Sequence, residues 1–87
     1  MIRLRQYAEV IYEAAYTREQ AIELLENLGN QRDSLEAMTD AALADVLAAT
    51  ANQEDGGDGL YERLVDDAGD WIDTADVGEW FGRVDKY

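Results

Sequence analysis

The chain has 87 residues, 47% of them hydrophobic, which allows one domain near the small end of what folds without disulfides or metals. It contains no cysteine, so disulfide bonds and thiolate metal sites are excluded as sources of stability. Its net charge of −13 argues against direct binding of nucleic acid or of an anionic membrane, because the chain would repel both.

The N-terminal segment MIRLRQYAEVIYEAAY carries Glu9 and Glu13 inside its apolar pattern, so we do not expect a signal peptide. No apolar run approaches the roughly 20 residues that span a bilayer. We therefore expect a soluble protein in the cytoplasm of a host cell. The charge is uneven: residues 1–44 hold four basic and eight acidic side chains (net −4), whereas residues 45–87 hold three and twelve (net −9).

Helix-forming residues fill the first half of the chain, and proline is absent. Apolar residues spaced three and four apart predict a first helix over residues 2–15. Thr17 and Gln20 have the spacing of a capping box, in which each side chain binds the backbone N–H of the other residue. A second helix is therefore expected to begin at Thr17 and to stop at Gly29, a common C-terminal cap residue.

Two further cap residues, Ser34 and Thr39, predict a third helical region in one or two pieces. The segment NQEDGGDG, near 52–59, is the clearest break and predicts a flexible loop rich in glycine. A continuous apolar face from Leu60 to Ala75 then predicts a fourth helix. The last expected element is a short helix that carries Val77, Trp80, Phe81 and Val84.

These patterns predict an all-α fold, a small bundle of four to five short helices in a single domain over residues 1–87. No segment shows the strict alternation of a half-buried strand, and no internal repeat is present. The alternative is a small mixed α/β fold in which RLRQYAEVIY or EWFGRV forms a strand.

Residues 54–79 hold ten carboxylates and one basic side chain, Arg63. The carboxylates recur every three or four residues, which would align five of them on one stripe of a helix. Neighbours on that stripe would rise about 4.5 to 6 Å along the axis, comparable to the spacing of phosphates on a nucleic-acid strand. Each pair of like charges costs a few tenths of a kcal/mol, so the stripe as a whole costs about 1 to 2 kcal/mol. The stripe comprises Asp58, Glu62, Asp66, Asp70 and Asp73.

The ordinary interpretation of such a run is a solvated polar face. One version is adaptation to high salt, indicated by a single lysine, Lys86, beside plentiful Asp, Ala and Arg. The functional interpretation is mimicry, in which the stripe replaces a phosphate backbone in the basic groove of a partner. Trp71 and Trp80 would add aromatic anchors, and both otherwise suit a core. The residues expected to bind the partner are Asp58, Glu62, Asp66, Asp67, Asp70, Trp71, Asp73, Asp76 and Glu79.

In its length, its charge, its lack of Cys and His and its segment LVDDAGDWIDTADVGEW, the chain resembles the small acidic proteins of phages and mobile elements that disarm host defence, the anti-CRISPR proteins and other DNA mimics. The resemblance covers the C-terminal third. It implies an inhibitor that binds a CRISPR effector or another nucleic-acid-handling complex. The alternative is a non-catalytic helical module for protein–protein interaction whose acidic face is only solvated.

Catalysis is not expected, because the chain has no His and no Cys to act as base, proton shuttle or thiolate nucleophile. Ser34, the only serine, stands where a helix cap would. The EDGGDG segment fails as an EF-hand, since its twelfth position is Val65 or Arg63 rather than Glu. We therefore expect no metal and no cofactor. Tyr12 and Tyr16 are expected to share a face and would line a core, a partner surface or a homodimer.

Overall fold

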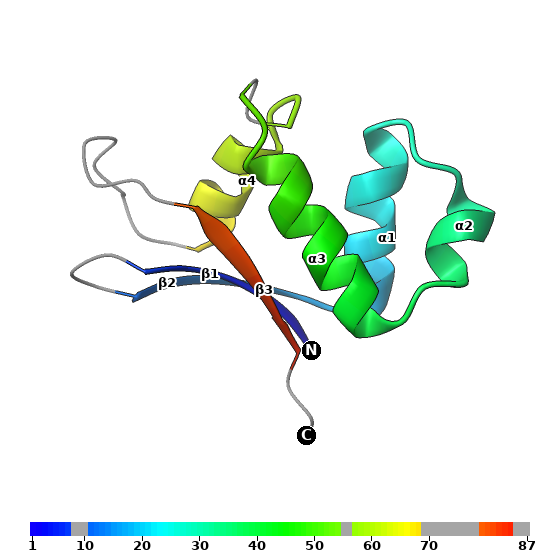
Figure 1. Ribbon diagram of the computed structural model, residues 1–87, viewed down its shortest axis with the longest axis horizontal. Helices are drawn as coiled ribbons and strands as arrows, with labels where there is room; N and C mark the ends of the chain where they lie inside the picture. The colour runs from blue at the N-terminus through cyan, green and yellow to red at the C-terminus, as the bar shows by residue number, and fades with distance from the viewer. Residues whose placement is uncertain (8–10, 55–56, 69–78, 85–87) are drawn as a thin grey trace.

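The computed structural model describes residues 1–7, 11–54, 57–68 and 79–84. Over these residues it is a small α/β fold in which one antiparallel sheet of three strands is combined with four helices (Figure 1). The strands are β1 (Ile2–Tyr7), β2 (Ile11–Tyr16) and β3 (Trp80–Val84), and their order in the sheet is β2-β1-β3. The expected all-α bundle is therefore wrong, and the mixed α/β alternative describes the chain.

The helices are α1 (Arg18–Asn27), α2 (Arg32–Glu36), α3 (Asp40–Ala51) and α4 (Leu60–Asp67). The predicted capping box at the start of α1 is confirmed. The Gln20 backbone N–H donates to Thr17 Oγ1 (3.2 Å), and the Thr17 N–H donates to Gln20 Oε1 (3.0 Å). Thr39 caps α3 by accepting from the Ala42 N–H (3.1 Å). The third predicted region is thus two helices, α2 and α3. The cap predicted at Ser34 is wrong, because Ser34 lies within α2, whose N-cap residue is Gln31.

The helix predicted over residues 2–15 is instead the β1–β2 hairpin. Alternate side chains of β1 point to opposite sides of the sheet, with Ile2 and Leu4 buried and Arg3 between them partly exposed. Arg3 and Arg5 both form ion pairs with Glu13 on β2, directly opposite Arg5. On β2, Ala14 and Tyr16 are likewise buried two residues apart, so the burial in both segments has the period of a strand and not that of the predicted helix.

The short final helix predicted around Trp80 is also wrong, because that segment is β3. It pairs with β1 from the other end of the chain, with Trp80 opposite Gln6 and Val84 opposite Ile2. Gly82 lies within β3, directly opposite Leu4 of β1. A Cβ on it would lie 2.7 Å from the carbonyl carbon and oxygen of Ala44, so α3 lies directly on β3 at this point.

The core lies between the sheet and the helices, with α3 across β1 and β3 and α4 beside β2 (Figure 1). Trp80 is at its centre and is 1% exposed, so this tryptophan is a core residue. Its ring meets that of Tyr61 edge-on, with centroids 6.1 Å apart. Asn52, after the end of α3, binds the Trp80 backbone twice: its Nδ2 donates to the carbonyl (2.9 Å), and its Oδ1 accepts from the N–H (2.8 Å).

The described part of the predicted loop near 52–59 contains a tight turn. Gly57 is buried with φ +65°, and a Cβ there would lie 2.3 Å from the carbonyl oxygen of Thr50. Only glycine fits a left-handed residue this close to backbone. None of the described helices has the length and apolar character needed to cross a membrane.

Candidate functional site

The acidic face of α4 is the candidate binding surface that the described residues contain. Leu60 and Leu64 bury one side of the helix in the core. Glu62 and Asp66 lie on the opposite side, both exposed and one turn apart, which separates them by about 6 Å along the axis. Glu62 is in the first turn, where the positive end of the helix dipole stabilises a carboxylate.

Of the five predicted stripe residues, Glu62 and Asp66 lie on α4 as the structure describes it. Asp58 lies in the loop before α4, because the helix begins only after Gly59. Its φ angle is +60°. The expectation that Asp58 continues the helical stripe is therefore wrong. Glu79 is exposed immediately before β3. The remaining predicted residues lie outside the described part of the chain: Asp70, Trp71, Asp73 and Asp76.

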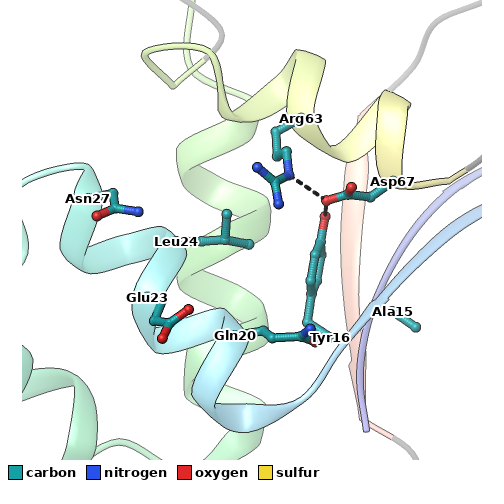
Figure 2. A pocket seen from close by; sticks show the side chains of 8 residues that line it. All are labelled: Ala15, Tyr16, Gln20, Glu23, Leu24, Asn27, Arg63 and Asp67. Atoms are coloured by element: carbon teal, nitrogen blue, oxygen red, sulfur yellow. Dashed lines mark hydrogen bonds and ion pairs between the residues drawn. The ribbon is translucent and has the colours of Figure 1, made fainter.

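Asp67 belongs to a different surface from Glu62 and Asp66. Its Oδ2 accepts hydrogen bonds from the Tyr16 hydroxyl (2.5 Å) and from Arg63 Nε (2.8 Å), as Figure 2 shows. Burial and the carboxylate together raise the pKa of Tyr16 far above its ordinary value. The bond to Asp67 also raises the pKa of Arg63. Asp67 is thus bound within the chain and is poorly placed to act as a phosphate surrogate.

The Tyr16–Asp67 contact lies in an open cleft of about 350 Å³. Figure 2 shows side chains of α1 on one side of the cleft, with Arg63 and Asp67 reaching in from α4. Tyr16 is held protonated as a donor, so it is not suited to act as a base. Among the described residues, no group of three potential metal ligands occurs, here or elsewhere. The lining is Ala15, Tyr16, Gln20, Glu23, Leu24, Asn27, Arg63 and Asp67.

Other arginines neutralise carboxylates away from α4. Arg18 forms an ion pair with Asp40 (2.7 Å), and Arg32 forms ion pairs with three glutamates of α1 and α2. Within the described ranges, no arginine forms an ion pair with Glu62 or Asp66. The three glutamates on Arg32 are Glu19, Glu26 and Glu36.

No family model, curated protein or solved structure matches the chain in the three comparisons made.

Two contacts of Asp67 were not predicted from the sequence. The first is the bond from Tyr16 to Asp67, which joins β2 to α4 across most of the chain and leaves no local signal. The second is the pairing of Arg63 with Asp67, for which a signal existed: the two residues are four apart on a helix, a spacing that favours ion pairs.

Proposed function

We propose that this chain is a non-catalytic inhibitor that binds the basic nucleic-acid groove of a host defence complex. Its contact surface is the outer face of α4, and the resemblance to anti-CRISPR proteins suggests a CRISPR effector as the partner. One observation carries the proposal: Glu62 and Asp66 stand one turn apart, exposed, and without an ion pair among the described residues.

Three physical features suit this surface to replace a phosphate backbone: the spacing of its carboxylates, the fixed position of the helix and the net charge of the chain. Two carboxylates about 6 Å apart on a regular helix present charge at a spacing comparable to that of a nucleic-acid strand. The burial of Leu60 and Leu64 holds the helix against the core, so the charges are fixed before binding. A net charge of −13 adds long-range attraction to a basic groove, which speeds association.

The test is competition for labelled target DNA on purified CRISPR effector complexes, followed by fluorescence anisotropy. The wild-type chain displaces the DNA from its target complex. Glu62→Lys/Asp66→Lys raises the inhibition constant at least about tenfold, equivalent to about 1.4 kcal/mol. The matched control is Asp45→Lys/Glu54→Lys, which changes the net charge equally at two exposed carboxylates outside α4.

Two outcomes count against the proposal. If the α4 variant inhibits as well as the wild type, α4 is not the contact surface. If the control loses as much inhibition as the α4 variant, net charge alone accounts for binding, and the helix face has no special role.

A second candidate, adaptation to high salt, is favoured by one observation. Exposed carboxylates without an ion pair among the described residues are not confined to α4, since Asp33, Asp45 and Glu54 are of this kind on other elements. Under this interpretation the acidic surface keeps the fold hydrated in concentrated salt. Thermal melts at low and at molar KCl separate the two: a salt-adapted chain unfolds at low salt, whereas an inhibitor with ordinary stability does not.

A further inference from the structure

The cleft beside the Tyr16–Asp67 contact is lined by side chains of α1 and α4 and has a volume of about 350 Å³. That volume is at the lower end of the roughly 300 to 1,000 Å³ typical of small-molecule sites. Four of the lining residues belong to α1 and are three or four positions apart, which places them on one face of the helix. These four are Gln20, Glu23, Leu24 and Asn27.

The guanidinium of Arg63 is the positive group of the cleft. Among the described residues its ion-pair partner is Asp67, which it binds through Nε (2.8 Å). Figure 2 shows both Nη atoms directed away from Asp67 and toward α1. Asp67 is itself held by the Tyr16 hydroxyl, so Arg63 is fixed along its Nε edge. The Nη edge of a guanidinium held in this way can bind a carboxylate through two parallel hydrogen bonds.

Glu23 supplies a negative group on the α1 side of the cleft. It is exposed, and within the described ranges no basic side chain forms an ion pair with it. Gln20 adds an oriented donor, because its Oε1 accepts the Thr17 N–H in the capping box and its Nε2 makes no part of that contact. Asn27, the last residue of α1, adds a second amide. The cleft therefore offers hydrogen-bond donors and a carboxylate acceptor side by side.

The charges of the lining indicate the class of ligand. Arg63, Glu23 and Asp67 together carry −1, so a simple anion is opposed by two carboxylates and by the net charge of −13. A simple organic cation is opposed by the guanidinium of Arg63. No group of three potential metal ligands occurs in the described part of the chain. A small zwitterion, in contrast, meets an opposite charge at each of its ends.

We propose that the cleft between α1 and α4 binds a free α-amino acid. The carboxylate of the ligand accepts hydrogen bonds from the Nη atoms of Arg63, its ammonium group donates to Glu23, and its side chain lies against Leu24. Because the cleft is open, water screens these charges, and we expect a dissociation constant in the millimolar range. Glu62 and Asp66 do not line the cleft, so this site does not rest on the proposed function.

The experiment is an NMR titration of the ¹⁵N-labelled protein with L-alanine, L-leucine and L-glutamine, each at constant ionic strength and up to about 50 mM, which covers millimolar dissociation constants. Saturable shifts are expected at the side-chain amides of Gln20 and Asn27 and at the Arg63 Nε–H. The side-chain amides of Gln31 and Gln53, which do not line the cleft, should not shift.

Two analogues distinguish a free amino acid from the end of a peptide. N-acetyl-L-alanine carries only the carboxylate, as a peptide C-terminus does, and L-alaninamide carries only the ammonium group, as an N-terminus does. Each should bind at least about fivefold more weakly than the tightest of the three amino acids, because one of the two charge contacts is lost.

Two variants test the residues that recognise the ligand. Arg63→Gln and, separately, Glu23→Gln should each weaken binding of the tightest amino acid at least about fivefold. The matched controls are Arg83→Gln and Glu62→Gln, which remove the same charges from exposed side chains outside the cleft and should bind like the wild type. Circular dichroism verifies that each variant is folded.

The proposal is overturned if none of the three amino acids produces saturable shifts at the cleft. It is also overturned if an analogue with a single charge binds as tightly as the amino acids, since a zwitterion is then not what the cleft recognises. Wild-type affinity in Arg63→Gln or Glu23→Gln, or an equal loss in the controls, contradicts the assigned contacts. None of these results affects the displacement of DNA from a host complex, so the two proposals can fail separately.

Discussion

Asn52 should be worth far more to this fold than its place in a surface loop suggests. Its amide makes both hydrogen bonds to the Trp80 backbone, as a neighbouring strand would (2.9 and 2.8 Å). Each bond contributes about 0.5 to 1.5 kcal/mol, so Asn52→Ala should cost about 2 kcal/mol. Asn52→Asp should cost at least as much, because a carboxylate would face the Trp80 carbonyl oxygen in place of a donor.

Urea unfolding followed by circular dichroism measures this cost. With a slope of about 1 kcal/mol per molar urea for so small a domain, the midpoint should fall by about 2 M. Gln53→Ala is the control, since it removes a neighbouring exposed side chain and should leave the midpoint unchanged. If Asn52→Ala and Asn52→Asp unfold within about 0.3 M of the wild type, the amide does not hold β3 and the reasoning is refuted.

Tyr16→Phe should cost about 1.5 to 3 kcal/mol, because it removes a hydrogen bond to the charged Asp67. The raised pKa of Tyr16 means that the unfolded chain loses this proton near pH 10 while the folded chain keeps it, so wild-type stability should fall as pH rises above about 10. Urea midpoints at pH 8 and above 10 check both points, and an equally steep alkaline loss in Tyr16→Phe would exclude this tyrosine as a source. Gly82→Ala should cost about 1 to 3 kcal/mol, because its Cβ would clash with the Ala44 carbonyl and push α3 off β3. An unchanged melting temperature would show that α3 and β3 can move apart to admit the methyl group without a loss of stability.

The starts of α1 and α3 were predicted correctly, because a cap residue stands immediately before each helix. The Thr17 capping box and the Thr39 cap are both in place. The hairpin was mistaken for a helix because its strands have only six residues each and the buried Gln6 interrupts the apolar alternation of β1, so no sustained period of two was visible. The EWFGRV segment was named as a strand in the α/β alternative, but its pairing with β1, at the other end of the chain, leaves no local signal.

The acidic surface was predicted in part. The spacing of Glu62 and Asp66 correctly indicated a shared exposed face opposite Leu64. The same spacing wrongly included Asp58, since two glycines around it favour a turn.

In the proposed function, the partner recognises the position of the carboxylates on α4 and not the acidity of the chain in general. The most direct test is the ratio of two inhibition constants for DNA displacement, that of Glu62→Lys/Asp66→Lys over that of Asp45→Lys/Glu54→Lys. Because the two variants carry the same net charge, the ratio isolates the position of the charges. We predict a ratio of about ten or more. A ratio near one would contradict the account.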